Sequence, residues 1–247
     1  PEVMTTQDLQ MALSRKFVSK HTWVSSLMGG RLYAIWHWKN LFGETIPTVK
    51  HQHQQMVALG LMEEMGYTDD EYEAIEKIID HQLDLRLAQF QLKQNIYKYG
   101  LANRVKNTQS ETPQFIFMRM AMALAEDEQI DKLLHVKNWY DHFSYGRINA
   151  PTPNYVNLGT KHNGYASCCL YTTDDTAASL AIGDHIAYTM TYMSSGIGGY
   201  IGSRSLGNPI RDGIIEHQGK LPYYRSLAAA VKANLQGGRG GACTTYF

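Results

Sequence analysis

Residues 165–173 (YASCCLYTT) and 196–201 (GIGGYI) are two short runs of β-forming and small residues, and the apolar run 177–193 between them has the length of a helix. Strands that alternate with helical crossovers are typical of a parallel α/β layer. A further helix-like run at 221–235 and a β-prone run at 244–247 repeat the alternation. We therefore predict an α/β arrangement for the C-terminal part of the chain.

The first part of the chain is predicted to be helical. Gly43 follows an apolar run with helical spacing and is typical of a helix end. Thr68 and Glu71 fit a capping box, and Thr112-Pro113 fits a cap followed by proline in the first turn. The predicted helices cover residues 23–41, 47–62, 68–79, 112–124 and 133–143. The fold class is thus α+β or α/β, with a helical domain over 1–145 and an α/β domain over 146–247.

The composition excludes several classes of protein. The 23 Lys and Arg balance the 23 Asp and Glu, which argues against a broad basic surface for nucleic acid. Three Cys in 247 residues are too few for a secreted disulfide framework. Arg31 interrupts the most hydrophobic stretch, and the N-terminus has no secretory signal pattern. We expect a soluble, cytoplasmic protein with no membrane partner.

Histidines and carboxylates offer only weak candidates for a metal site. His51 and His53 are two residues apart on a predicted helix, which favours a solvated polar face over a pair of ligands. Asp80, His81 and Asp84 could form a carboxylate–histidine site, but a polar cluster at a helix end is the stronger interpretation. The three Cys lack Cys-x-x-Cys spacing. We predict that this chain binds no metal.

Two glycine-rich segments match nucleotide-binding loops only in part. Residues 196–202 (GIGGYIG) would need a glycine at Ile201 to complete Gly-x-Gly-x-x-Gly, which argues against a hydride-transfer dehydrogenase. Residues 237–241 (GGRGG) lack the Gly-Lys-Ser/Thr ending of a Walker loop. The four glycines around Arg239 nevertheless indicate a loop whose guanidinium can bind a phosphate or a base edge.

Cys168 and Cys169 are adjacent on a predicted strand and therefore face opposite sides of it. One interpretation is a pair of small apolar residues that serve packing. The other is a single redox thiol whose partner comes from elsewhere, because vicinal disulfides are strained. Composition alone favours the first interpretation.

Taken in order, a set of segments resembles the large, catalytic subunit of class I ribonucleotide reductase. The resemblance covers most of residues 20–247, and the sixteen-residue step from Thr152 to Cys168 also agrees with the family. The matching segments are 79–81 (IDH), 97–104 (YKYGLANR), 151–153 (PTP), 166–170 (ASCCL), 196–198 (GIG), 204–211 (RSLGNPIR) and 236–242 (QGGRGGA). The resemblance implies a helical N-terminal domain followed by the first part of the family's ten-stranded α/β barrel.

The resemblance also implies roles for the substrate residues. Cys168 matches the first redox cysteine, which lies below the ribose and supplies one of two reducing equivalents. Ser167 would contact the ribose and Thr152 would lie beside the substrate phosphate. Gly196 is also among the residues that would bind the substrate. The substrate implied is a ribonucleoside diphosphate, reduced at its 2′ carbon by thiyl-radical chemistry.

Allosteric control is implied by a second group of residues. Asp175 matches the acid that binds the sugar of a specificity effector, Arg204 matches the arginine that holds its phosphates, and Arg211 belongs with them. The effector would be a deoxynucleoside triphosphate or ATP. A flexible loop would report the identity of the effector to the substrate base, with its polar members as readers. Its residues are Gln236, Gly237, Gly238, Arg239, Gly240 and Gly241.

Several family features do not occur in residues 1–247, including the thiyl-radical segment, the second redox cysteine and the ATP-cone signature. We therefore expect this chain to be an N-terminal piece that works with the C-terminal half of the large subunit on another chain. The resemblance further implies a radical-generating small subunit that holds the metal centre. It also implies a thioredoxin- or glutaredoxin-type reductant and a homodimer of the assembled large subunit. This chain itself would bind no cofactor.

A rival from another class is a nucleotide-binding regulatory or structural module without catalytic activity. Such a module would keep Asp175, Arg204 and the glycine-rich loop and would use Cys168 only for packing. The two hypotheses differ in whether the chain works with a second polypeptide that carries the remaining cysteines.

Overall fold

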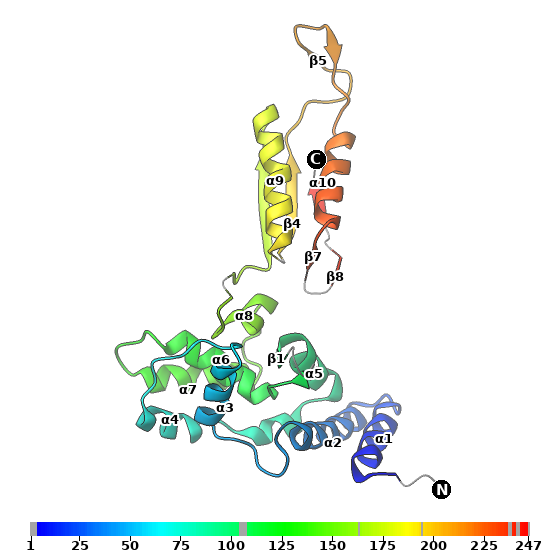
Figure 1. The fold of residues 1–247 in the computed structure, drawn as a ribbon. Helices are drawn as coiled ribbons and strands as arrows, with labels where there is room; N and C mark the ends of the chain where they lie inside the picture. The colour runs from blue at the N-terminus through cyan, green and yellow to red at the C-terminus, as the bar shows by residue number, and fades with distance from the viewer. Residues whose placement is uncertain are drawn as a thin grey trace. The chain divides into compact units, whose positions relative to one another are not determined.

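The computed structural model describes residues 4–103, 108–162, 164–193, 195–236, 239–240 and 243–246. The chain forms two compact units, Pro1–Tyr165 and Ala166–Phe247. Figure 1 shows the first unit in blue to green and the second in yellow to red. Each unit has a hydrophobic core of its own.

The first unit consists of helices and one small antiparallel strand pair. Its elements are α1 (Thr6–Val18), α2 (Trp23–Phe42), α3 (Val49–Ala58), α4 (Asp69–Glu76), the 3₁₀ helix η1 (His81–Arg86), α5 (Gln89–Gln94), the π-helical turn η2 (Asn95–Tyr99), β1 (Ala102–Asn103), β2 (Thr108–Gln109), α6 (Pro113–Ala125), α7 (Lys132–Ser144) and α8 (Thr152–Asn157). The helical character predicted for this part of the chain is confirmed.

Local signals set most of the helix ends. The Thr68 hydroxyl accepts the Glu71 amide hydrogen, and the Glu71 carboxylate accepts the Thr68 amide hydrogen at 2.7 Å, so the predicted capping box is confirmed. Thr112 is the N-cap of α6 with Pro113 in its first turn. Helix α2 ends at Gly43, whose φ of 74° is in the region that glycine adopts without strain.

Two predicted helices end earlier in the structure than in the sequence pattern. Helix α3 begins after the N-cap Thr48, so Pro47 precedes the helix and is not in its first turn. It ends at Ala58, because Gly60 turns the chain with a φ of 68°. Helix α4 stops at Glu76, and the chain continues into η1 after Asp80. The apolar spacing continues through these turns because the turn residues also pack on the core.

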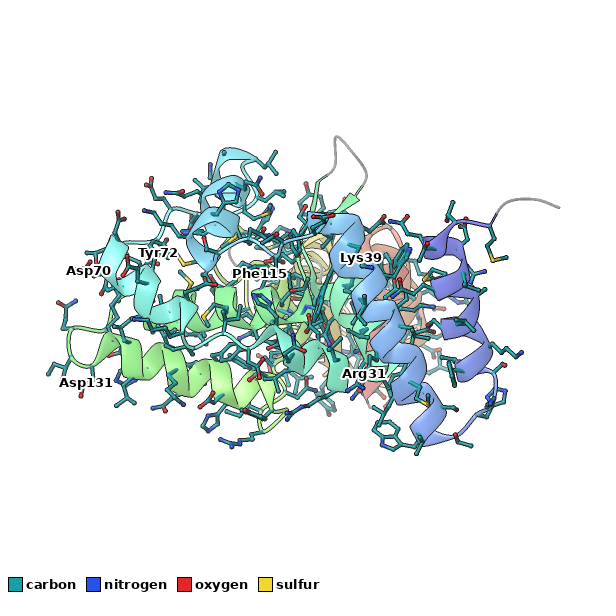
Figure 2. The ribbon with its side chains drawn as sticks, turned by 90° about the horizontal axis from the view of Figure 1, so that it is seen from below. Arg31, Lys39, Asp70, Tyr72, Phe115 and Asp131 are labelled. Atoms are coloured by element: carbon teal, nitrogen blue, oxygen red, sulfur yellow. The ribbon has the colours of Figure 1, made fainter. Side chains whose placement is uncertain are left out.

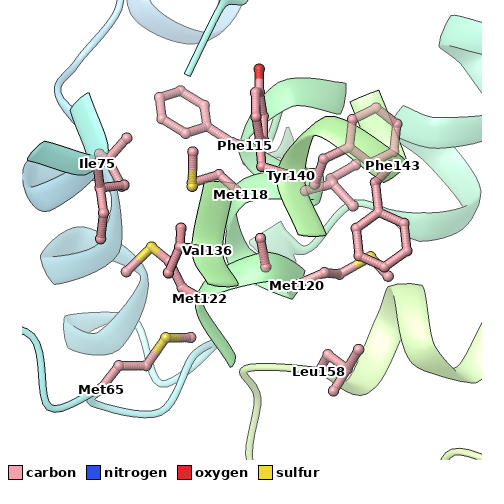
Figure 3. Packing of buried hydrophobic residues seen from close by; sticks show 14 of the residues in the cluster. Met65, Ile75, Phe115, Met118, Met120, Met122, Val136, Tyr140, Phe143 and Leu158 are labelled. Carbon is pink, nitrogen blue, oxygen red and sulfur yellow. The ribbon is translucent and has the colours of Figure 1, made fainter. Parts of the chain in front are cut away.

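Helix α6 is the centre of the first unit. Eleven of its thirteen residues are buried, as expected for a helix that is covered on every side. Met118, Met120 and Met122 are almost fully buried in a core to which α4 and α7 also contribute. Figure 3 shows these methionines beside Val136 and Tyr140 of α7 and Ile75 of α4.

The second unit contains a three-stranded parallel sheet in the order β3-β4-β9. Its elements are β3 (Cys168–Thr173), α9 (Ala177–Tyr192), β4 (Gly196–Ile201), β5 (Pro209–Ile210), β6 (Ile215–Glu216), α10 (Leu221–Lys232), β7 (Leu235–Gln236), β8 (Arg239–Gly240) and β9 (Cys243–Tyr246). Helix α9 connects β3 to β4, and α10 lies in the connection from β4 to β9. The predicted strand–helix alternation is present; closure into a barrel remains a prediction.

The two faces of this sheet differ. Helices α9 and α10 contact each other and pack on one face, where Ala187, Ile197 and Leu227 are buried. On the opposite face the side chain of Leu170 is 84% exposed and that of Tyr200 is 45% exposed. The described part of the chain thus leaves one face of the sheet open.

The composition changes after Gly146, but the two compact units meet at Tyr165 and Ala166. Helix α8 lies in the first unit because it packs on α6, and its Tyr155 is part of the core around α6. Leu158, just after α8, is buried in the same core. Residues 146–165 therefore extend the helical unit beyond the predicted boundary.

Candidate functional site

The predicted substrate residues of the second unit lie together at the amino ends of two neighbouring strands. Cys168 begins β3 and is in register with Gly196, which begins β4. The Gly196 amide donates to the Ser167 carbonyl at 2.8 Å, and the Ser167 hydroxyl lies 4.0 Å from the Cys168 sulfur. The Cys168 side chain is exposed, on the same open side of the strand as Leu170. A thiol in this position is accessible to a ligand.

Cys169 lies on the opposite side of β3. It is half-buried and packs against the core formed by α9, α10 and β4. The prediction that the two adjacent thiols face opposite ways is therefore confirmed, and the packing interpretation holds for Cys169. Of the two, Cys168 has the exposure that redox chemistry requires.

Asp175 and Arg204, predicted to bind one effector, form an ion pair. Asp175 follows β3 and Arg204 follows β4, so both lie at the carboxyl ends of adjacent parallel strands. The Arg204 Nε donates to the Asp175 Oδ2 at 2.7 Å, and its Nη1 donates to the Pro209 carbonyl at 3.2 Å. The hydrogen bond from Arg204 holds the pKa of Asp175 below its usual value. Ligands of open parallel sheets bind at this edge.

Arg211 lies at the turn between β5 and β6 and is exposed. Its φ is 48°, and that of Asp212 is 57°, so both residues adopt the left-handed conformation. Non-glycine residues adopt this region rarely and at an energetic cost. Arg211 thus lies in a tight turn of the connection that follows Arg204.

The predicted reading loop has its two ends in an antiparallel pair, with Gln236 in register with Arg239. Gly240 belongs to the same pair, and Gly237, Gly238 and Gly241 lie outside the described residues. Cys243 follows the loop and is in register with Ile197, the second residue of β4. The hairpin thus lies near the amino ends of the strands, at the same edge of the sheet as Cys168.

In this position the loop does not lie between the substrate residues and the effector residues of the same chain. The strands are six residues long, so their amino and carboxyl edges are about 20 Å apart. Within one chain the loop is therefore close to the substrate residues and distant from Asp175 and Arg204.

Thr152 belongs to the first unit, where it is the first residue of α8. A buried ion pair that sequence reasoning missed holds this helix. The Arg119 Nε donates to the Glu111 Oε1 at 2.8 Å, and both side chains are 1% exposed. Arg119 also donates to the carbonyls of Tyr155 and Leu158, which end α8. These bonds satisfy helix-end acceptors and fix the segment that carries Thr152.

A second buried polar cluster surrounds Asp84. The Trp38 indole and the Gln114 amide donate to its carboxylate at 3.1 and 3.0 Å. Burial raises the pKa of Asp84 to about 7, since no cation compensates the charge among the described residues. The interpretation of a polar helix end holds for Asp80, which caps η1, and is wrong for Asp84.

His81 and His53 are also less solvated than the sequence suggested. Burial lowers the pKa of His81 to about 4. His53 is buried and contacts the Tyr72 hydroxyl and the Glu63 carbonyl, whereas His51 is exposed. The two histidines of α3 do face different sides, but the inner one, His53, is held by buried hydrogen bonds and is not part of a solvated face. The burial of His53 and His81 depends on the elements packed around them, so the sequence pattern alone could not reveal it.

Two further features concern the described residues as a set. They contain no group of three or more His, Cys, Asp or Glu side chains arranged to hold a metal ion. Their helices are also too short or too polar to cross a lipid bilayer.

Comparisons with known proteins find a family match for part of the chain and relatives for most of it. The family described as "Ribonucleotide reductase, all-alpha domain" matches residues 90–163, which lie in the helical unit. The alpha subunit of ribonucleoside-diphosphate reductase 1 from Escherichia coli K12 is 33% identical over 224 residues, 87% of this chain and 29% of that protein. The alpha subunit from Buchnera aphidicola subsp. Schizaphis graminum is 31% identical over 93% of this chain and 31% of that protein. The enterobacteria phage T4 alpha subunit is 34% identical over 73% of this chain and 24% of that protein.

These similarities relate the chain to the alpha subunits of ribonucleoside-diphosphate reductases, and residues 90–163 match the all-alpha domain of ribonucleotide reductase. The chain spans less than a third of the length of the curated relatives it matches.

Proposed function

We propose that this chain is part of the large subunit of a ribonucleoside-diphosphate reductase, in which Cys168 is a redox thiol. The observation that carries the proposal is the exposed Cys168 at the amino edge of the sheet, beside Ser167 and Gly196. It occurs in a stretch of chain that is similar to reductase alpha subunits over 87% to 93% of its residues. The resemblance adds Thr152 as a residue beside the substrate phosphate.

The proposed reaction replaces the 2′ hydroxyl of the ribose by hydrogen and releases that hydroxyl as water. Two thiols become a disulfide and supply the two electrons, and Cys168 is one of them. The second thiol and the thiyl radical that abstracts the 3′ hydrogen come from the C-terminal half of the large subunit. A small subunit with a metal centre generates the radical. A thioredoxin- or glutaredoxin-type protein then reduces the disulfide.

The carboxyl edge of the sheet is the proposed effector site. Arg204 uses Nε on Asp175 and Nη1 on Pro209, which positions the guanidinium beside the carboxylate. A nucleoside triphosphate effector, a deoxynucleotide or ATP, would place its phosphates on Arg204 and Arg211 and its sugar on Asp175. Because the loop of Gln236 and Arg239 is at the other edge, a dimer partner would bring a second effector site within its reach.

The test is a reduction assay with the chain assembled with the remaining large-subunit polypeptide and the small subunit. We expect Cys168→Ser to abolish multiple turnover and Cys169→Ser to leave most of the activity, since only Cys168 is on the open face. The chain without those partners should not reduce nucleotides. Full activity of the Cys168→Ser assembly would refute the proposal.

The alternative is a nucleotide-binding module without catalysis. The observation that favours it is the Asp175–Arg204 pair, which is formed by residues of the second unit alone. Mass spectrometry of material purified under native conditions distinguishes the two functions. A second polypeptide with the missing cysteines supports the enzyme, and nucleotide binding without a partner chain or turnover supports the module.

A further inference from the structure

Helices α1 and α2 expose apolar side chains that nothing in the described part of the chain covers. Leu9 and Leu13 of α1 are 50% and 40% exposed, and Val24 and Met28 of α2 are 66% and 47% exposed. Exposed apolar side chains that occur singly need no explanation, whereas a contiguous group marks an interaction surface.

Contacts between the two helices show that these side chains form one stripe. Ser14 donates to the Gly29 carbonyl at 2.6 Å, and Gln10 donates to the Leu32 carbonyl at 3.0 Å. Leu13 lies beside this contact line, on the side away from the core, where helical spacing also places Leu9 and Phe17. We call the following set the hairpin stripe: Leu9, Leu13 and Phe17 of α1, with Val24, Met28, Leu32 and Ile35 of α2.

The charges around the stripe have one sign. The sequence contains no Asp or Glu between Asp8 and Glu44, although the whole chain has equal numbers of acids and bases. Five cations lie in that interval, and none forms an ion pair in the described structure: Arg15, Lys16, Lys20, Arg31 and Lys39. Figure 2 shows Arg31 and Lys39 along α2.

Four of these cations border the stripe. Lys16 is next to Leu9 and Leu13 on the helical surface, and the Lys20 Nζ lies 5.5 Å from the centre of the Phe17 ring. Arg31 and Lys39 flank Met28 and Ile35 on α2 by the same spacing. The surface is thus an apolar centre with a cationic rim and no carboxylate.

We propose that the hairpin stripe docks an acidic amphipathic helix of a partner protein. A helix with apolar residues at i, i+3, i+4 and i+7 would lie along the stripe, and its carboxylates would meet Lys16, Lys20, Arg31 and Lys39. A second copy of this chain is a poor occupant, because twofold pairing would oppose the same four cations. A lipid surface is disfavoured because the exposed Trp23, which would anchor in the headgroup region, lies on another side of α2.

The experiment uses the full chain and a fluorescent 20-residue peptide with Leu at the apolar positions and Glu at the others. We expect saturable binding in fluorescence anisotropy that weakens with added salt, and no comparable binding of the same peptide with Lys in place of Glu. The double variant Leu13→Glu/Met28→Glu should weaken binding at least tenfold. Arg31→Glu should weaken it several-fold. Leu59→Glu, at an apolar residue 50% exposed elsewhere in the unit, is the matched control and should bind as the parent does.

Three results would overturn the proposal. One is the absence of saturable binding of the acidic peptide by the parent chain. Another is equal binding by the parent and both stripe variants, with circular dichroism showing all of them folded. The third is binding to vesicles of phosphatidylserine and phosphatidylcholine that the stripe variants abolish while the peptide does not bind, which would make the stripe a lipid surface.

Discussion

At the scale of single residues, Asp84 makes the strongest prediction about pH. Its pKa rises from an ordinary 3.8 to about 7 on folding, so the folded state holds a proton that the unfolded state has lost. Stability due to this group is therefore full below about pH 4 and falls as the pH rises to 7, by at most about 1.4 kcal/mol per pH unit.

Asp84→Asn should remove this slope. The amide keeps an oxygen for one of the two donors, Trp38 or Gln114, and carries no buried charge. Denaturant unfolding at pH 5, 6, 7 and 8 would show the parent losing stability relative to the variant up to about pH 7, with little further change at pH 8. Because the lowered pKa of His81 acts in the opposite direction, the comparison must be between parent and variant at each pH. Parallel curves would show that Asp84 is ionised throughout.

The two adjacent cysteines predict a difference in thiol reactivity. Cys168 is exposed, and Cys169 packs against the core of α9, α10 and β4. Iodoacetamide should therefore modify Cys168 at least several-fold faster than Cys169 in the folded chain, and at similar rates in denaturant. Peptide mass spectrometry of a time course separates the two sites. Equal rates in the folded chain would mean that β3 does not hold the two side chains apart.

The sequence could reveal only those site features that depend on local spacing. Period-two alternation was enough to place Cys168 and Cys169 on opposite faces. The Asp175–Arg204 pair was expected only through family resemblance, because 29 residues separate its members. The Trp38–Asp84 bond joins residues 46 apart, and no local pattern marks such a pair. Buried polar clusters therefore require the packed structure to be seen.

At the scale of elements, Gly30 allows α2 to pack closely against the backbone of residues 87–89, where α5 begins. A Cβ added there would lie 2.1 Å from the Leu87 carbonyl oxygen, and this neighbour is backbone that cannot rotate away. Gly30→Ala should cost about 1–3 kcal/mol of unfolding free energy, as other overpacking changes with a backbone shift do.

Gly66→Ala is the matched control for this change. A Cβ at Gly66 meets nothing within 4 Å, and its backbone is not in the left-handed region. Its effect should be within about 0.5 kcal/mol. Thermal and denaturant unfolding of the three proteins would measure both effects. If Gly30→Ala were as mild as the control, α2 would be free to move away from residues 87–89.

Element types followed from the sequence more reliably than element ends. Thr68, Thr112 and Gly43 each carry a local signal that the structure uses. At the end of α3 the apolar pattern outweighed the local signal of Gly60, because residues such as Met62 pack on the core from outside the helix. Apolar periodicity reports burial, and burial continues past a helix end.

At the scale of the whole molecule, the two units differ in how far they can bury their own apolar surface. The cores around α6 and around Tyr33 lie entirely within Pro1–Tyr165. Among the residues whose burial is described, the core of the second unit has five members, and its sheet leaves Leu170 and Tyr200 exposed on the open face. Small domains with an incomplete core are marginal in stability.

We therefore predict that residues 1–165 fold alone and residues 166–247 do not. The shorter chain should keep the helical circular dichroism of the first unit and unfold in one cooperative transition within a few degrees of the parent's. The remainder should show no cooperative transition and should aggregate, because β3 and β9 have open edges in the described sheet and one face is uncovered. A cooperative transition in residues 166–247 would show that α9, α10 and three strands suffice for a domain. Loss of structure in residues 1–165 would show that its core depends on the second unit.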